Sequence, residues 1–429
     1  MAINIDMIHP ADQIIMIMER IYGYGMTTTS GGNISVKDCD GNIWITPGRL
    51  DKGNLKRHQV VCAAPDGTWI GPHPPSSEFP FHRAVYRARP DLRAVIHAHP
   101  PALVSFSLTG RIPDTSILPQ TMAVCGEVGY AAYAVPGSGE LADNVAAAFG
   151  KGHNTVLMEN HSIVCGGEDI LHAFRRFETL DFCARTHIHA SSLGKAVALP
   201  REVIQEAPEE LPETAQEGRG CAAPPPKETA LRRDMCNLIH RAYDQMLFTS
   251  TQGTFSARLD EASFLITPYG MDRKYISHED IVRISGGKRE PGKCPSRSVR
   301  LHDAIYRGNS AVNAVMIAHP PHVMAYSVTG KTFDTKVMPE AYVFLKEVPV
   351  LPFGVQRRNY AETAEVFKEH PVVLIANDCI IVTGGDLVGC FDRLEITEYI
   401  AHSLIWAMQI GEIQGLPEKD LEELRGFWK

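Results

Sequence analysis

The pattern of apolar and polar positions divides the chain into amphipathic helices and short apolar strands. Helices are predicted at ADQIIMIMERIYGYG (11–25), at GELADNVAAAF (139–149), over 169–190 and at LRRDMCNLIHRAYDQ (231–245). Apolar runs predict strands at AVIHAH (94–99) and TVLMEN (155–160). Since strands and helices do not alternate strictly, we expect an α/β protein of the α+β kind, with a mixed sheet covered by helices, rather than a doubly wound parallel sheet.

This pattern occurs twice along the chain. The segment VIHAHPPALVSFS (95–107) matches VMIAHPPHVMAYS (315–327), and TSGGNIS (29–35) matches STQGTFS (250–256). Thr46 and Thr267 lie 221 residues apart, and His99 and His319 lie 220 apart, so the offset is nearly constant. The sequence therefore predicts a tandem duplication. We call residues 1–200 the first copy and 230–429 the second copy, and expect an acidic, Pro-rich linker at 201–229 between them.

Composition and charge narrow the class of protein. The 429 residues are 44% hydrophobic and 21% charged, with a net charge of −8 and a pI near 6.1. Nucleic acid is not expected as a partner, because binding to phosphate backbones needs a basic face. The N-terminus does not resemble a secretory signal, and we find no run of roughly 18 apolar residues for a membrane. Ten isolated cysteines are typical of reduced thiols, so we expect a cytoplasmic globular protein.

The first copy contains a candidate metal site. On a strand, residues i and i+2 point to the same face, so His97 and His99 project two imidazoles side by side. His161, at the end of the strand over 155–160, and Glu78, after Pro-Ser-Ser, are the further candidates. Three histidines and a carboxylate suit a catalytic Zn²⁺ or a similar divalent ion, one per chain. The alternative is that these histidines are only packed or surface side chains.

Two neighbouring motifs are suited to an anion. TSGGNIS supplies Ser30, Gly31 and Asn33 in a turn whose backbone N–H groups can hold an anion. Ser76 and Ser77 stand at a predicted helix N-terminus, where unpaired N–H groups and the helix dipole favour a phosphate or carboxylate. The alternatives are a simple glycine turn and a serine that only caps the helix. Beside a metal site, the two motifs together predict an anionic substrate.

In their order and spacing these motifs resemble the class II aldolase/adducin family. The motifs are Gly-Asn-x-Ser (32–35), Thr-Pro (46–47), Pro-Ser-Ser-Glu (75–78), His-x-His (97–99) and Asn-His (160–161). The resemblance covers nearly all of residues 8–195 and, more weakly, 230–410. It implies a three-layer class II aldolase-like fold in each copy. The family includes L-fuculose- and L-rhamnulose-1-phosphate aldolases, ribulose-5-phosphate 4-epimerase and several decarboxylases.

The resemblance also implies roles for single residues. It implies that Glu78 lies beside the metal and acts as acid and base. It implies that the metal chelates a ketose phosphate and stabilises the enediolate left when a C–C bond breaks. The zinc ligands that it implies are His97, His99 and His161. The phosphate-binding residues that it implies are Asn33, Ser76 and Ser77, with Gly31 and Thr46 as weaker contributors.

The second copy lacks most of these residues. Glu78 aligns with Ser298, His97 with Ile317 and His161 with Asp378, while His99 aligns with His319. We therefore expect no catalytic metal in the second copy.

A tyrosine that the family's aldolases supply across a subunit boundary is absent from the first copy, where Thr121 and Met122 stand near its place. The resemblance implies rings of four domains. We hypothesise that two chains form a pseudo-tetrameric ring, in which Tyr342 of the second copy completes the first copy's site.

The leading functional prediction is a metal-dependent lyase acting on a sugar phosphate, of the fuculose/rhamnulose 1-phosphate aldolase type. Decarboxylation and 4-epimerisation on the same site are the alternatives, although the epimerases usually carry Asp where this chain has Glu78. A third alternative is a non-catalytic interaction protein like adducin. The intact set of Glu78 and three histidines argues against that reading.

Overall fold

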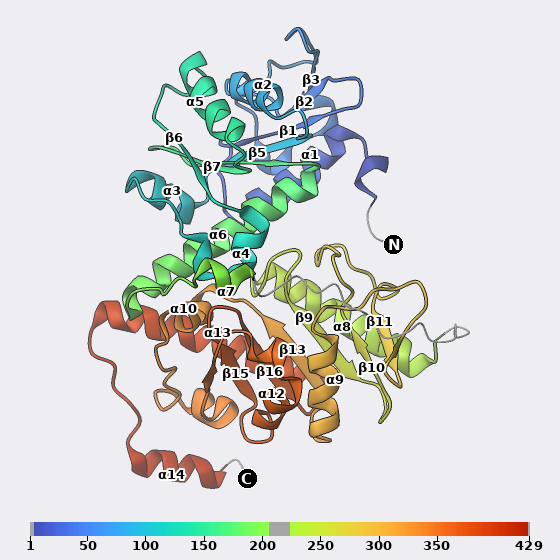
Figure 1. Ribbon diagram of the computed structural model, residues 1–429, viewed down its shortest axis with the longest axis vertical. Helices are drawn as coiled ribbons and strands as arrows, with labels where there is room; N and C mark the ends of the chain where they lie inside the picture. Colours follow the sequence, from blue (N-terminus) through green and yellow to red (C-terminus); the bar gives the residue numbers. More distant parts are fainter. Residues whose placement is uncertain (1–3, 206–223, 428–429) are drawn as a thin grey trace. The chain divides into compact units, whose positions relative to one another are not determined.

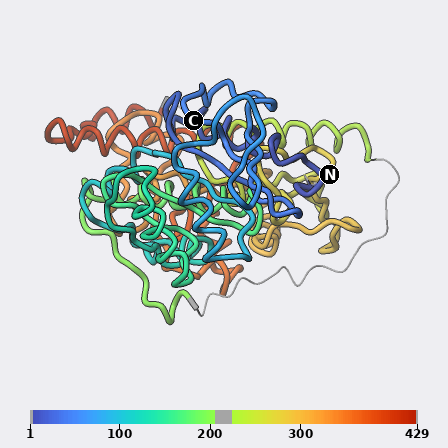
Figure 2. The backbone as a smooth tube through the Cα atoms, turned by 90° about the horizontal axis from the view of Figure 1, so that it is seen from above, coloured from blue at the N-terminus to red at the C-terminus, as the bar shows by residue number. Residues whose placement is uncertain are grey.

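The computed structural model describes residues 4–205 and 224–427, and its backbone contacts divide the chain into two compact units (Figure 1). One unit spans Asn4–Arg185, and the other begins at Thr186, within the last helix of the first copy. Figure 2 follows the same backbone from a second direction, with the residues outside the described ranges in grey. Residues 206–223 of the expected linker lie outside those ranges, and its two ends, 201–205 and 226–229, are helical.

The first unit is built on a mixed sheet of eight strands in the order β4-β3-β2-β1-β5-β8-β7-β6. Neighbouring strands are antiparallel, except for β6 and β7, which are parallel. The strands are β1 (Asn33–Lys37), β2 (Ile43–Ile45), β3 (Val61–Ala63), β4 (Trp69–Ile70), β5 (Ala94–Ala98), β6 (Gly129–Ala131), β7 (Thr155–Met158) and β8 (Ile163–Gly167).

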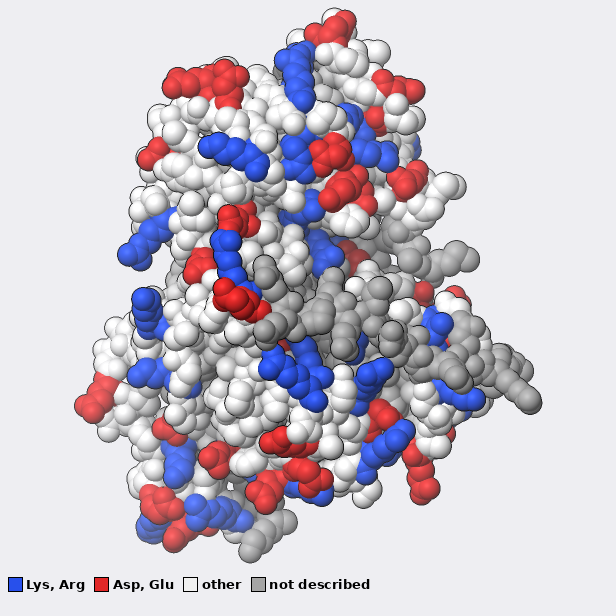
Figure 3. Space-filling view, viewed as in Figure 1, with Lys and Arg blue, Asp and Glu red and all other residues white. Residues whose placement is uncertain are grey.

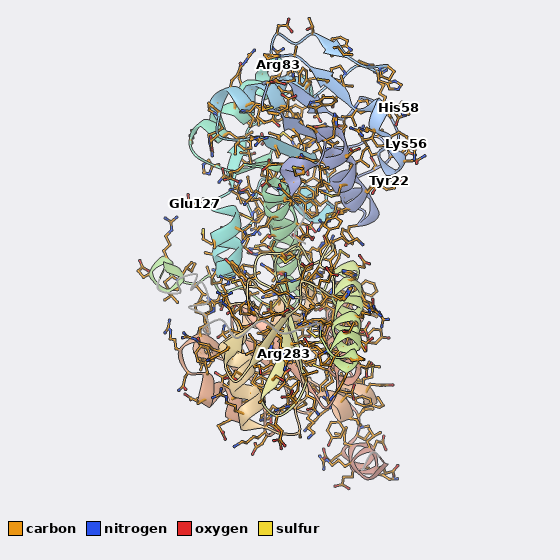
Figure 4. All side chains as sticks on the ribbon, turned by 90° about the vertical axis from the view of Figure 1, so that its right-hand side faces the viewer. Tyr22, Lys56, His58, Arg83, Glu127 and Arg283 are labelled. Carbon is orange, nitrogen blue, oxygen red and sulfur yellow. The ribbon has the colours of Figure 1, made fainter. Side chains whose placement is uncertain are left out.

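Helices cover both faces of this sheet, with α2 and α5 on one face and α1 and α6 on the other (Figure 1). Arg83 on α2 and Tyr22 on α1 mark these two layers in Figure 4. The α-helices are α1 (Pro10–Gly23), α2 (Phe79–Ala88), α3 (Pro101–Leu108), α4 (Pro119–Cys125), α5 (Gly139–Gly150) and α6 (Ile170–Leu193). The short helix α7 (Arg201–Gln205) belongs to the other unit. The 3-10 helices are η1 (Ile5–Met7), η2 (Lys52–Asn54), η3 (Arg57–Gln59) and η4 (Thr115–Ile117).

The strand β5 determines which side chains face the site. Val95 packs in the core cluster that Phe81 and Val85 of α2 form with α5. Because side chains alternate along a strand, His97 points to the same face as Val95. Its ring lies edge-on to that of Phe81, with the centroids 5.7 Å apart. The imidazole of His97, on the central strand β5, therefore lies between the sheet and α2.

The second unit repeats this architecture. Its eight strands follow the order β12-β11-β10-β9-β13-β16-β15-β14, which is the order of the first sheet strand for strand. They are β9 (Thr254–Arg258), β10 (Ser263–Ile266), β11 (Val282–Ser285), β12 (Lys288–Arg289), β13 (Ala314–Ala318), β14 (Val350–Leu351), β15 (Val372–Ile375) and β16 (Cys379–Gly384). The helices are α8 (Pro226–Asp244), α9 (Val299–Gly308), α10 (Pro321–Thr329), the π-helix η5 (Ala341–Leu345), α11 (Val355–Arg358), α12 (Tyr360–Val366), α13 (Leu387–Ile410) and α14 (Glu418–Phe427).

The strand register confirms the duplication residue by residue. Asn33 is the partner of His97 between β1 and β5, and Thr254 is the partner of Ile317 between β9 and β13. The predicted mixed sheet covered by helices, present in two tandem copies, is therefore confirmed. Among the described residues, no helix is both long and apolar enough to cross a bilayer.

Candidate metal centre

The structure brings the three predicted histidines together. His97 lies in β5 and His99 directly after it, with their ring centroids 4.6 Å apart. His161 lies in the tight turn between β7 and β8, where Asn160 has a positive φ of 51°. Its ring centroid is 4.8 Å from that of His97 and 5.2 Å from that of His99. One nitrogen from each ring lies within 4.8 Å of the others, a spacing that could hold a metal ion.

The protonation of these rings suits a metal. Nδ1 of His97 donates to the carbonyl of Ile163 at 2.9 Å, which leaves the lone pair on Nε2. Nε2 of His97 and Nε2 of His99 are buried without a hydrogen-bond partner. Burial lowers the pKa of His97 well below its usual value and that of His99 to about 4. Neutral imidazoles with free, converging nitrogens are the donors that a divalent metal binds, so the residues fit the predicted ion.

Glu78 faces the three rings. Its Oε2 lies 3.3 Å from Nε2 of His97, and its Oε1 lies 3.5 Å from Nε2 of His161. Oε1 is buried and has no hydrogen-bond donor. Glu78 is the N-cap of α2 and makes no side-chain capping bond, so its carboxylate is not tied to the helix end. The fourth predicted residue therefore joins the cluster, with one oxygen free to act.

The other carboxylate oxygen is held by a buried hydrogen-bond chain. Nδ2 of Asn33 donates to Oε2 of Glu78 at 2.7 Å, and Oδ1 of Asn33 accepts from Nε2 of His82 at 2.5 Å. Nδ1 of His82 in turn lies 2.7 Å from the hydroxyl of Ser35. The second copy repeats His82 as His302. The sequence shows His82 four residues after Glu78, but not that Asn33 links the two.

The predicted anion motifs converge on the N-terminus of α2 and on the histidines. A methyl group added at Gly31 would lie 3.0 Å from Nδ1 of His99, so this turn adjoins the cluster. Ser76 is nearly buried and Ser77 is exposed, at the residues before Glu78. A methyl group at Gly48 would lie 3.9 Å from the backbone nitrogen of Ser77, which places the loop after Thr-Pro against the helix end.

Three of the residues predicted to bind the anion, Ser30, Asn33 and Thr46, differ in their burial and in their hydrogen bonds. Ser30 is exposed in the Gly-rich turn. The side chain of Asn33 is occupied by Glu78 and His82, and Asn33 is 2% exposed. Thr46 is fully buried, and its hydroxyl accepts from the N–H of Ile34. Thr267 makes the same bond to Phe255 in the second copy, so this hydroxyl links two neighbouring strands in both copies.

In the second copy, apolar packing and an ion pair replace the histidine cluster. Ile317, at the position of His97, belongs to a core cluster with Leu301 and Ile305. Asp378, at the position of His161, pairs with Arg357 at 2.9 Å. Among the described residues, the only group of three or more potential ligands close enough for a metal is the one in the first copy.

Tyr342 occupies the position of Met122. The hydroxyl of Thr115 donates to the carbonyl of Gly126 at 3.0 Å, and that of Thr335 donates to the carbonyl of Lys346 at 2.6 Å. These equivalent bonds give both segments the same register. Tyr342 lies in η5, and its hydroxyl accepts a hydrogen bond from Nε of Arg425, whose guanidinium lies 5.6 Å from the ring centroid.

Comparisons with known proteins agree with this geometry. The 5-deoxy-D-ribulose 1-phosphate aldolase of Bacillus thuringiensis serovar kurstaki is 33% identical over 201 residues, which are 45% of this chain and 91% of that protein. An L-fuculose phosphate aldolase of Methanocaldococcus jannaschii is 32% identical over 39% of this chain and 90% of its own. The 3-oxo-tetronate 4-phosphate decarboxylase of Escherichia coli K12 is 29% identical over 41% of this chain and 84% of its own.

The family model named Class II Aldolase and Adducin N-terminal domain matches twice, over residues 12–188 and 233–405. The two matches cover the two sheets with their helices, and together they span most of the chain. The chain therefore belongs to the class II aldolase and adducin N-terminal domain family, of which it carries two tandem copies.

Proposed function

We propose that the first copy is a metal-dependent aldolase that cleaves a ketose 1-phosphate into dihydroxyacetone phosphate and an aldehyde, in a reversible reaction. The observation that carries this proposal is the convergence of three neutral imidazoles and the Glu78 carboxylate beside the N-terminus of α2. The aldolases among the relatives, named for 5-deoxy-D-ribulose 1-phosphate and L-fuculose phosphate, support the same class of substrate.

The cofactor of this reaction is a divalent metal, with Zn²⁺ as the first candidate, one per chain. His97, His99 and His161 would hold it, leaving room for substrate oxygens. When bound, the metal supplies Lewis-acid polarisation of the substrate carbonyl and of the neighbouring hydroxyl oxygen.

The protein side chains handle the proton and the phosphate. Glu78 carries the proton to and from the carbon that loses its bond, using Oε1, which has no other partner. Asn33 and His82 keep the carboxylate turned toward the imidazoles. Ser76 and Ser77, at the N-terminus of α2, and Ser30 and Gly31 in the turn beside His99 bind the phosphate. Burial of Glu78 and His97 excludes bulk water from the point of proton transfer.

Tyr342, acting in a neighbouring chain, is proposed to exchange a proton with the hydroxyl oxygen that becomes the aldehyde: it accepts this proton on cleavage and donates it in the reverse reaction. The first copy has Met122 at this position, and the equivalent bonds of Thr115 and Thr335 support the alignment. A ring of two chains, with four domains in alternation, would supply the tyrosine from the second copy. The cytoplasm is the proposed location, which the free state of the nine cysteines in the described ranges supports.

No nucleic acid is proposed as a partner. On the face shown in Figure 3, acidic and basic side chains of the described residues are interspersed, and no broad basic surface covers it. The net charge of −8 has the sign that disfavours phosphate backbones.

Decarboxylation is the second candidate function. It is favoured by the 29% identity to the decarboxylase of E. coli and by the methionine that the first copy has at position 122, where the second copy has Tyr342. In that reaction Glu78 would protonate the carbon that loses CO₂. The two functions share the metal ligands and differ in the bond that breaks.

The test is a screen of the zinc-loaded full chain against ketose 1-phosphates and 3-oxo acid phosphates. Release of dihydroxyacetone phosphate, with kcat falling by at least ~100-fold in Glu78→Gln, is the expected result. Release of CO₂ without any retro-aldol cleavage would replace the aldolase by the decarboxylase. If neither product forms and the chain binds no metal, the protein is a binding module. The Tyr342→Phe variant tests the tyrosine, because an unchanged kcat would remove it from the mechanism.

A further inference from the structure

The end of α6 and the residues after it lie along α10 of the second copy. The imidazole of His189 stacks on that of His322, with the ring centroids 3.9 Å apart. The N–H of Val197 donates to the carbonyl of Val328 at 2.8 Å. All four residues belong to the same compact unit. We call residues 186–197 the docking segment, because this end of the first copy is bound to a helix of the second.

The helix α10, which the docking segment contacts, is buried where the equivalent helix α3 is exposed. The two helices are related by the offset of 220 residues that also relates the central strands β5 and β13. Val328, in the last turn of α10, is 1% exposed, whereas Leu108 at the same place in α3 is 63% exposed. Ala325 is likewise buried, and its equivalent Ser105 is exposed. One helix face thus has a partner in the second copy and is open to solvent in the first.

The closing helices α6 and α13 differ in the opposite sense. Both have 24 residues, and Arg176 and Arg393 make equivalent hydrogen bonds to the preceding strand, each at 2.7 Å, so the helices share one register. Leu193, the last residue of α6, is 7% exposed, but Ile410, the last residue of α13, is 88% exposed. The docking surface is therefore covered at the end of the first copy and exposed at the end of the second.

Exposed apolar side chains form a stripe along α13. Tyr399, Trp406 and Ile410 are all exposed, and their spacing of seven and four residues places them on one face of the helix. We call these three residues the α13 stripe. The hollow beside them has a volume of about 350 Å³, and its lining includes Ile400, Leu404 and Ala407. Clustered apolar side chains of this kind on a protein surface typically mark a contact with another protein.

The side chains at the point of contact differ in size in opposite directions. His189 of the docking segment corresponds to Trp406 of the α13 stripe, and His322 of α10 corresponds to Ala102 of α3. Trp406 is larger than His189, whereas Ala102 is smaller than His322. A tryptophan packed over an alanine therefore takes the place of one histidine stacked on another with little change in total volume, the kind of exchange that packing tolerates best.

We propose that the α13 stripe of one chain packs on α3 of a second copy of the same chain, and that the second copy returns the contact. Each contact repeats between chains the one that the docking segment makes on α10 within a chain. A contact between two different surfaces closes only when the partner returns it, and two chains then form a dimer with two identical contacts. The inference rests on the pairing of two chains proposed above, for which it names the surfaces, and not on the aldolase chemistry.

The experiment is sedimentation equilibrium of the full chain at micromolar concentration. The expected mass is twice that of the 47.3 kDa chain. Leu108→Glu and Trp406→Arg should each weaken dimerisation by at least ~30-fold, because each change places a charge in both contacts. Both side chains are exposed in the single chain, so the variants should fold like the parent, which circular dichroism and the melting temperature check.

An equimolar mixture of the two variants distinguishes this geometry from other dimers. In a mixed dimer one contact keeps both parent residues, and the other places the new arginine against the new glutamate. The mixture should therefore dimerise at least ~10-fold more tightly than either variant alone. A dimer built on α13 against α13 gives a different result, because Leu108→Glu would then leave it intact.

The matched controls are Val388→Glu, in the first turn of α13, and Trp69→Arg, in β4. Both change exposed apolar side chains outside the two surfaces and should leave the dimer as it is. Trp406→Arg should keep the metal content of the parent chain, which separates a failure of this proposal from a failure of the proposed function. Three outcomes overturn the proposal: a monomeric parent chain, a dimer that Leu108→Glu leaves unchanged, and a mixture that dimerises no more tightly than its components.

Discussion

The side-chain amide of Asn33 donates to Oε2 of Glu78 at 2.7 Å, and the second copy has replaced both residues, by Thr254 and Ser298. The amide and the carboxylate lie on different elements, at the start of β1 and at the N-cap of α2. Because His82 holds the other end of the amide, the carboxylate has one orientation, with Oε1 turned to His161.

The first prediction concerns this pair. Asn33→Thr, the second copy's own residue, should lower kcat by roughly 10–100-fold, since partners behind a functional group typically contribute that much. KM should change little, because the carboxylate and not the phosphate loses its partner. Steady-state kinetics on the substrate found in the screen measure both constants, and Thr254→Asn serves as the matched change in the second copy. A rise in KM with unchanged kcat would instead assign Asn33 to phosphate binding.

The second prediction concerns the metal. Elemental analysis of the full chain should find about one divalent metal per chain. His99→Ala should abolish it, while His319→Ala, at the equivalent position, should leave it unchanged. Chelation should lower the melting temperature of the parent chain, because a metal that binds only the folded state stabilises it. Two metals per chain would refute our interpretation of the second copy.

One part of the histidine cluster could be predicted from local geometry. The alternation along β5 places His97 and His99 on one face, and the repeat identifies which residues the second copy has lost. The mixed sheet was also predictable, since its strands are short apolar runs that do not alternate strictly with helices.

Contacts between distant elements could not be predicted in this way. Asn33 and His82 are 49 residues apart, and only the packing of α2 on β1 brings them together. Arg357 has no counterpart in the first copy, so no alignment shows that it reaches Asp378. The hydrogen bond from the N–H of Ile34 to the buried hydroxyl of Thr46 is another contact that the motif alone does not show.

The third prediction concerns acid stability. Burial lowers the pKa of His82 and of His302 to about 3, and that of His99 and of His319 to about 4. As the pH falls below about 6.5, these histidines take up a proton in the unfolded chain but stay neutral in the folded chain. The free energy of unfolding is therefore highest above that pH and decreases as the pH drops toward 4. Each such histidine contributes a slope of ~1.4 kcal/mol per pH unit in this range.

Urea unfolding of the metal-free chain at several pH values between 6.5 and 4.5 measures the slope. His302→Gln should reduce this slope by the contribution of one histidine, ~1.4 kcal/mol per pH unit. The control is His58→Gln, which changes an exposed side chain of the first copy (Figure 4) and should leave the slope as it is. An equal slope in the parent chain and in His302→Gln would contradict the assignment of His302 as a buried neutral imidazole.

The last prediction concerns the backbone that carries His97 and His99, the proposed metal ligands. Gly32 has a φ of +69°, and an added methyl group would lie 2.9 Å from the carbonyl oxygen of His97 and 3.2 Å from Cα of Ala98. Gly110 has a φ of +64°, and an added methyl group would meet nothing within 4 Å. In both alanine variants a non-glycine residue must adopt the left-handed backbone conformation, which costs about 1–2 kcal/mol. Only in Gly32→Ala does the added methyl group also collide with β5. Backbone atoms cannot turn aside as a side chain can, so β5 must shift.

We therefore expect Gly110→Ala to lose about 1 kcal/mol of stability and to keep its metal affinity. Gly32→Ala should lose at least ~2 kcal/mol and should also bind the metal more weakly, because moving the carbonyl of His97 moves its imidazole. Denaturant unfolding and a metal competition titration measure the two effects separately. Equal losses in both variants, with unchanged metal affinity, would show that the turn at Gly32 does not fix the position of His97.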